Sequence, residues 1–340
     1  MIDSSGPEDS DRRRVRTAQR EAGFTVVEVA VAVILFTIVM GAIYGLLRVA
    51  RAGRLNVNTR AEALQNARIA LNTLSRDAIN AGVGYPNLGA TLPDNRLSAL
   101  LGGAGDEDAD PDLLTPVHAL NDVNKVNGVD TDQVTFIFID DTFDDGNSLP
   151  ISAVKGEGAE LTLQSGFDNS PCRQGDVYIF TGQNGSALGV LKQGDEDSDS
   201  DAISLAAGDK LGINNPGAGS PIAKITAPGS ILRVSWVSYF VAPEDRNGTG
   251  TGTLMRRVYG GDSGWSDQPL AFGVENFQVQ YVLINGVVVD VPAANQMDDI
   301  RQVRVSVTVR SPDIDPATHE PFRTTLTSTF STRNLVYEKI

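Results

Sequence analysis

Alternating carboxylates are the side chains of this sequence whose spacing most directly suggests chemistry. One acidic run holds Asp195, Asp197, Asp199 and Asp201, and a second holds Asp106, Asp108, Asp110 and Asp112. Hard oxygen ligands at such a spacing can wrap a calcium ion in a loop. The first run, however, has Ser200 and Ala206 where an EF-hand requires a glycine and a glutamate. A solvated acidic loop therefore competes with a calcium site, and calcium is the one cofactor that the sequence leaves open.

Side chains for nucleophilic catalysis are scarce. The two histidines, His118 and His319, are far apart and lie in sequence that we expect to be loop. A histidine-activated nucleophile and a multi-histidine metal site are both excluded by this count. The single cysteine, Cys172, is expected to be a small buried residue and not a reactive thiol. A glycosidase-like pair of carboxylates cannot be identified among so many acids, and we predict that the protein is not an enzyme.

The overall charge limits the classes of partner. The 340 residues include 28 Lys and Arg against 43 Asp and Glu, which gives a formal net charge of −15. Such a chain repels phosphate backbones, so direct nucleic-acid binding is not expected. With 41% hydrophobic residues, 34 glycines and 16 prolines, the composition indicates a globular, turn-rich protein.

An apolar run near the N-terminus is long enough to cross a membrane. Residues 24–47, FTVVEVAVAVILFTIVMGAIYGLL, carry one charge, Glu28, and about 20 apolar residues suffice for a spanning helix. Five arginines lie before it, at positions 12, 13, 14, 16 and 20, and three follow it, at positions 48, 51 and 54. The excess before the run favours a cytoplasmic N-terminus and a single pass that sends the rest of the chain outward.

Glu28 requires an explanation, because a carboxylate within hydrocarbon costs about 2 to 3 kcal/mol. An ordinary secretory signal is one alternative, since Ala50-Arg51-Ala52 offers a small-x-small cleavage site. Three features argue against it: the apolar run exceeds the usual signal core of about 7 to 15 residues, Gly23 directly precedes it, and Glu28 lies inside it. A plain signal anchor with a tolerated acid is the other alternative.

The order Gly23, Phe24, Thr25 and Glu28, followed by an unbroken apolar stretch, resembles the type III signal of type IV pilins and type II secretion pseudopilins. The resemblance implies that prepilin peptidase removes residues 1–23, that the new amine of Phe24 is methylated, and that the apolar helix is retained in the bacterial inner membrane. It also implies other minor and major pilins or pseudopilins and an inner-membrane assembly platform as partners. Glu28 could then pair with the N-terminal ammonium of a neighbouring subunit during assembly.

The periodicity beyond the span predicts a continued helix. Apolar residues recur at steps of three and four, at Val57, Ala61, Leu64, Ala67, Leu71, Leu74 and Ala78. This stripe is expected to pack on a sheet. Gly82, Gly84 and Pro86 predict the end of a helix over about 24–81, roughly 85 Å long at 1.5 Å per residue.

The remaining sequence is typical of an antiparallel β structure. Residues 87–130 are expected to be loop and short elements without a regular core role. Strands are predicted at 134–139, 176–181 and 231–241, followed by a hairpin whose Asn285-Gly286 favours a type I′ turn. Alternating valines over 303–309 and the run 322–330 predict a closing antiparallel pair.

The stretches QNARIALNTLSRDAINAG, GVDTDQVTFIF, CRQGDVYIF and TLTSTFSTRNL resemble PilW-type minor pilins and the J-type minor pseudopilin of type II secretion. The expected fold is α+β and pilin-like: leader 1–23, membrane half of the helix 24–47, amphipathic half 48–82, and β-rich head 83–340. The implied role is a minor subunit that initiates or caps a type IV pilus or secretion pseudopilus. The alternative is a signal-anchored or secreted adhesion module that binds calcium.

Overall fold

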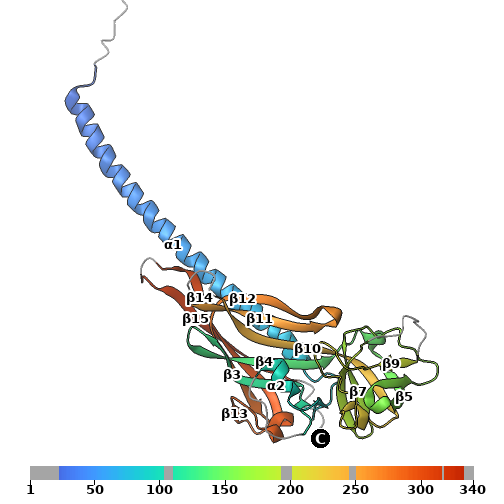
Figure 1. Ribbon diagram of the computed structural model, residues 1–340. Coiled ribbons are helices and arrows are strands. Elements are labelled where there is room, and N and C mark those ends of the chain that lie inside the picture. Colours follow the sequence, from blue (N-terminus) through green and yellow to red (C-terminus); the bar gives the residue numbers. More distant parts are fainter. Residues whose placement is uncertain (1–22, 103–109, 193–200, 245–249, 316–317, 333–340) are drawn as a thin grey trace, which may run out of the picture. The chain divides into compact units, whose positions relative to one another are not determined.

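The computed structural model describes residues 23–102, 110–192, 201–244, 250–315 and 318–332 (Figure 1). The chain forms two compact units that divide after Leu55. The first described element, α1, runs from Val26 to Asn80 and so contributes to both units. Its C-terminal end is set by Gly82 and Gly84, whose φ angles of 80° and 66° suit glycine far better than any residue with a Cβ. The predicted long helix and its stop signal are confirmed.

The second unit contains a large antiparallel sheet, which we call the first sheet. Its strand order is β15-β14-β12-β11-β10-β4-β3, with β13 paired to β12. The strands are β3 (Val117–Val126), β4 (Val129–Ile139), β10 (Gly229–Glu244), β11 (Thr251–Gly260), β12 (Gly264–Leu283), β13 (Val288–Val289), β14 (Ile300–Ile314) and β15 (Pro321–Ser331). This sheet and the apolar helix confirm the α+β, pilin-like fold predicted above.

A second sheet lies in the same unit. It comprises β1 (Ala90–Thr91), β2 (Leu113–Leu114), β5 (Leu149–Lys155), β6 (Glu160–Leu163), β7 (Val177–Gly182), β8 (Gly185–Val190) and β9 (Ala202–Ser204). One pair, β1 with β8, is parallel, and the other pairs of this sheet are antiparallel. Helix α2 (Arg96–Leu101) and five short 3-10 helices, 143–146, 156–158, 222–224, 261–263 and 294–299, complete the described elements.

Strand β10 belongs to both sheets. Its first residues, Gly229 to Arg233, pair with β5 and β7 of the second sheet. From Val234 onward it pairs with β4 and β11 of the first sheet. A 16-residue strand is long enough to carry both sets of ladder hydrogen bonds, and it joins the two sheets within one covalent element (Figure 1).

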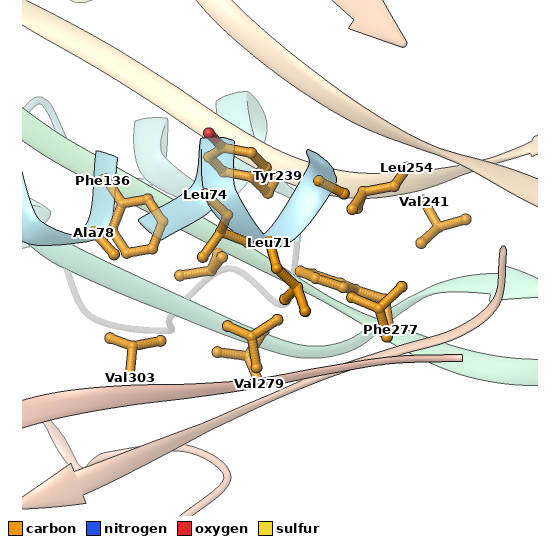
Figure 2. Packing of buried hydrophobic residues seen from close by; sticks show 14 of the residues in the cluster. Leu71, Leu74, Ala78, Phe136, Tyr239, Val241, Leu254, Phe277, Val279 and Val303 are labelled. Atoms are coloured by element: carbon orange, nitrogen blue, oxygen red, sulfur yellow. The ribbon is translucent and has the colours of Figure 1, made fainter. Parts of the chain in front are cut away.

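The second half of α1 packs on one face of the first sheet. Ala67, Leu74 and Ala78 are fully buried and belong to one apolar cluster. Figure 2 shows Leu74 and Ala78 of this cluster together with the sheet residues Phe277 and Val303. The small alanine side chains allow the helix backbone to approach the sheet closely, and the leucines fill the remaining space. The predicted stripe is therefore correct from Ala67 to Ala78.

The N-terminal part of that stripe was predicted wrongly. Val57 is 67% exposed and Ala61 is also exposed, whereas Ala63, which the periodic pattern omitted, is buried. The buried positions in this part of the helix are Ala63, Ala67, Ala70, Leu71 and Leu74. They lie on the one side of α1 that faces the sheet, because an α-helix completes a turn every 3.6 residues.

The expectation that residues 87–130 lack a regular core role was also wrong. Strand β3 occupies Val117–Val126 and places Val117, Ala119 and Val126 in the core beneath α1. It pairs with β4 across a register shift between Leu120 and Asn124. His118 consequently lies in a strand and not in loop sequence. A bulge and several polar residues interrupt the alternation of apolar side chains in this strand, so the sequence pattern did not predict it.

The predicted strands and the closing pair are confirmed, with one correction to a turn. Val303 pairs with Phe330 and Val307 with Leu326 in β14 and β15. The hairpin after β12 forms, and the Leu283 amide donates to the Val287 carbonyl at 2.9 Å. Only Gly286 has a positive φ, 80°, so the turn is a three-residue loop and not type I′.

Candidate processing and assembly site

The residues before and at the start of α1 form a hydrogen-bonded helix cap. The Thr25 amide and hydroxyl each donate to the Glu28 carboxylate Oε2 at 3.0 Å, and the Glu28 amide donates to Thr25 Oγ1 at 3.3 Å. A threonine before the helix and a glutamate three residues later constitute a capping box, which satisfies amide groups that have no partner within the helix. The T-x-x-E spacing at 25–28 would have predicted this cap, and the sequence interpretation missed it.

The cap engages one oxygen of the Glu28 carboxylate. Both bonds from Thr25 go to Oε2, and an ionised carboxylate offers about four lone-pair positions over its two oxygens. Oε1 is therefore available for a further donor. The site can fix the first helical turn and accept a charged group at the same time.

The peptide bond between Gly23 and Phe24 is accessible in the described structure. Gly23 is exposed and has open space around the position of a Cβ, and the Phe24 side chain is 86% exposed. Neither residue belongs to α1, which begins at Val26. The arginines of the leader lie outside the described residues.

The first part of α1 presents apolar side chains without any protein cover. Val26–Arg51 is long and apolar enough to cross a membrane, with a mean hydropathy of 2.7. None of the residues in its apolar window is buried within the protein. Leu35, Phe36 and Ile38 are each about 60% exposed. A helix that is apolar all round is stable only within lipid or among other apolar helices.

The structure does not test the predicted calcium site, because most of its ligands lie outside the described residues. Asp195, Asp197 and Asp199 lie outside the described residues, and Asp201 is exposed. Within the described ranges, no group of three acidic, histidine or cysteine side chains is arranged to hold a metal. Of the second run, Asp106 and Asp108 also lie outside, and the buried Asp112 accepts a hydrogen bond from the Leu97 amide of α2.

The lone thiol and the histidine of β3 are both perturbed by burial. Burial raises the pKa of Cys172 to about 12, which keeps the thiol protonated and unreactive. Burial lowers the pKa of His118 to about 4, so its imidazole is neutral at physiological pH. Neither residue has the environment of a catalytic group.

A buried ion pair joins α1 to the first sheet. Asp77, 7% exposed, accepts hydrogen bonds from the Tyr239 hydroxyl at 2.5 Å and from Arg256 Nε at 2.8 Å. Burial is the largest single influence and would lower the pKa of Arg256, but the hydrogen bonds and charges of Asp77 and Tyr239 together raise it. The sequence offered one signal for this cluster, an aspartate three residues after Leu74 on the buried stripe, and that signal was missed.

A second polar contact ties α1 to the C-terminal strands. Arg60 lies 3.2 Å from the carboxylate of Asp315 and 4.9 Å above the ring centroid of Phe322 on β15. The two contacts fix the guanidinium between an anion and an aromatic face. Together with Asp77, Arg60 defines the rotation of the helix on the sheet.

Comparison with known families matched two parts of the chain. Residues 18–44 match the prokaryotic N-terminal methylation motif, and residues 238–334 match the type IV pilus-assembly protein W family. The chain is type IV pilin-like and carries a prepilin signal. The first match contains Gly23, Phe24 and Glu28, and the second extends from within β10 to just beyond β15.

The pilin-like matches agree with the described geometry. The motif covers the capped start of α1, and the pilus-assembly match covers most of the sheet on which the second half of α1 packs. One description names a pilus-assembly protein and the other a methylation motif, and neither names an enzyme family. The comparisons with curated proteins and with solved structures gave no match.

Proposed function

We propose that this chain is a minor subunit of a type IV pilus that a prepilin peptidase cuts between Gly23 and Phe24. Removal of the leader leaves Phe24 as the N-terminal residue, whose amine is then methylated. The observation that carries the proposal is the capped, uncovered apolar helix that begins at Val26, inside the region matched by the methylation motif.

The proposed path of the subunit follows from the same helix. It spans the bacterial inner membrane once, with the head outside the cytoplasm, until the assembly platform transfers it to the filament. In the filament the apolar side chains of Val26–Arg51 exchange lipid for the helices of neighbouring pilins. The exchange costs little, because one apolar surrounding replaces another.

Glu28 is the proposed register determinant. In an apolar surrounding its carboxylate requires a cationic partner, and the N-terminal ammonium of an adjacent subunit supplies one. The Oε1 atom that the capping box leaves available would accept this ammonium while Oε2 remains bonded to Thr25. An assembled neighbour would thus be held at one axial position.

The finer part of the proposal is a place at the start or tip of the filament. The matched family is described as pilus assembly, which supports a role in building the filament over a role as its bulk subunit. The same description favours the pilus over a secretion pseudopilus.

The N-terminal residue of the membrane-bound protein tests the proposal. Mass spectrometry of protein from cells with prepilin peptidase is expected to show a chain that starts at methylated Phe24, and cells without the peptidase should retain residues 1–23. A chain that starts at Met1 in both strains, or at Gly53 after conventional signal cleavage, would refute the proposal.

A further inference from the structure

A polar groove lies beside the second sheet, away from the residues that match the pilus-assembly family. One part of about 580 Å³ is lined by the segment before α2 and by residues 208–215. A second part of about 290 Å³ adds residues 217–221 and Lys224. Because Pro93, Asp94 and Asn215 line both parts, they form one continuous groove of a size typical for small-ligand sites.

The charges along the groove balance. Its ionisable side chains are Asp94, Asp110, Arg96 and Lys224, two carboxylates and two cations. On a protein with a net charge of −15, this groove is a locally neutral place. Such a lining offers both hydrogen-bond donors and acceptors without a field that selects an ion of either sign.

One charged donor of the groove is held in place without a counter-ion. Arg96 lies against Gly212, where a Cβ would stand 2.5 Å from one of its nitrogens. None of the ion pairs formed among the described residues includes Arg96. Its guanidinium offers several N–H donors in a fixed fork, which a ligand hydroxyl could accept. The Ser220 hydroxyl also lacks a hydrogen bond, but it is fully buried beside Gly158 and is not exposed to the groove.

The walls of the groove are rigid and partly apolar. Pro93, Pro111 and Pro221 line it, and proline rings restrict the backbone while exposing C–H groups. A sugar ring presents the same combination, hydroxyl groups at its edge and C–H groups on its face. Walls that are already ordered reduce the entropy lost on binding.

We propose that this groove binds an uncharged carbohydrate. Asp94, Asp110 and Asn215 would accept hydroxyl hydrogens, and Arg96, Lys224 and the Asn215 amide would donate to hydroxyl oxygens. The proposal goes beyond pilus assembly, because the groove lies outside both regions matched by known families. It gives the minor subunit a ligand for its head that is independent of its helix.

Gly219 provides a direct way to block the groove. It lines the second part, it has open space where a Cβ would stand, and its φ is not positive. Gly219→Tyr should fill the groove without backbone strain, and Gly219→Ala is the matched control. Asn215→Ala removes an exposed side chain that lines both parts and serves as a second loss-of-binding variant.

Isothermal titration calorimetry on the mature full chain tests the proposal, with cellohexaose, maltohexaose and chitohexaose as neutral probes. The chain is kept in lauryldimethylamine oxide, because a glycoside detergent would compete. A hexauronate and inorganic phosphate are the anionic probes. We expect at least one neutral probe to bind with a Kd that is insensitive to salt, as uncharged recognition requires. Gly219→Tyr and Asn215→Ala should weaken this binding tenfold or more, and Gly219→Ala should leave it within twofold.

Three results would overturn the proposal: no neutral probe binds at millimolar concentration, only the anionic probes bind, or Gly219→Tyr binds as well as the parent while its melting temperature is unchanged. None of these results bears on the proposed role in pilus assembly, since the cleavage before Phe24 is measured separately. A loss of cleavage with retained sugar binding would refute assembly and leave the groove standing.

Discussion

Glu28 combines two roles that substitution can separate. Glu28→Gln keeps an amide oxygen for the Thr25 cap but removes the charge, whereas Thr25→Val removes the hydroxyl of the cap and keeps the charge. We expect Glu28→Gln to be processed and membrane-inserted normally but to fall at least tenfold in sheared filaments. Quantitative immunoblots of the sheared and membrane fractions measure this ratio.

Thr25→Val is the control for that experiment. Loss of a helix cap destabilises a helix by about 0.5 to 2 kcal/mol, and a long membrane helix tolerates this. The variant should therefore enter filaments within about twofold of the parent. Equal defects in the two variants would mean that Glu28 acts through the cap and not through its charge.

The buried pair of Asp77 and Arg256 allows a prediction about stability. Asp77→Asn leaves the half-buried guanidinium of Arg256 without a counter-charge, and breaking a buried pair in this way costs about 3 to 5 kcal/mol. Urea unfolding of the mature chain in detergent, followed by the fluorescence of Trp236 and Trp265, should show this decrease in the free energy of unfolding.

The neighbouring arginine supplies the matched control. Arg257 and Asp267 form a 2.6 Å pair whose side chains are both more than a third exposed. Asp267→Asn is expected to cost no more than about 1 kcal/mol, because exposed pairs are screened by water. If both substitutions lowered the free energy of unfolding by the same small amount, the ion pair of Asp77 with Arg256 would not stabilise the fold more than an exposed pair does.

At the scale of elements, the contact between α1 and the first sheet depends on small side chains. Ala67 is a fully buried residue on the face of α1 that packs on the sheet, and Ala67→Leu should overpack this contact and destabilise the head by about 1 to 3 kcal/mol. The exposed Ala61→Leu is the control and should change stability by about 0.5 kcal/mol or less. Differential scanning calorimetry would detect the lower melting temperature of the first variant alone.

Periodicity predicted the elements whose burial is uniform and failed where long-range contacts decide. The alternating valines of β14 and the stripe from Ala67 to Ala78 were correct, since one whole face of each is buried. Strand β3 was missed because Asp122 has a positive φ within its bulge and polar residues interrupt the pattern. The sequence of β10 does not reveal that this strand belongs to both sheets, nor which strands it pairs with. Most of its partners, such as β4 and β5, lie far from it in the chain.

The candidate site shows the same limit at shorter range. Gly23, Phe24 and Glu28 were predicted as processing and assembly residues from residue order, and the Thr25 cap follows from a four-residue spacing. The contact of Asp77 with Tyr239 spans 162 positions, so no local pattern encodes it. The polar groove likewise depends on two loops that only the fold brings together.

At the scale of the whole molecule, His118 makes stability depend on pH. Its pKa is about 4 in the folded chain and near the ordinary 6.5 when unfolded, so the unfolded chain binds the proton first as the pH falls. Stability is therefore retained above pH 6.5 and decreases between 6.5 and about 4, by at most about 3 kcal/mol. Asp132 opposes this trend, because burial raises its pKa.

Comparing the parent with His118→Gln isolates this contribution. The difference in unfolding free energy between pH 7 and pH 4.5 should be smaller in the variant, because glutamine does not titrate. The carboxylates are common to both chains and cancel in the comparison. An identical pH profile for the two chains would show that His118 is as easily protonated in the folded state as in the unfolded one.

Strand β10 also determines the order in which the head can form. The strands β4, β5 and β7 are synthesised before it and can each pair with one earlier-made neighbour, β3, β6 and β8 respectively. Their other ladder partner, which also joins the two sheets, is available only when residues 229–244 are present. Until then, apolar residues of both sheets remain uncovered, a condition in which chains aggregate. A chain that ends before Gly229 would thus retain only the pairs made among β1 to β9, without the strand that joins the two sheets. The newly made subunit should therefore depend on chaperones until most of its length has been synthesised.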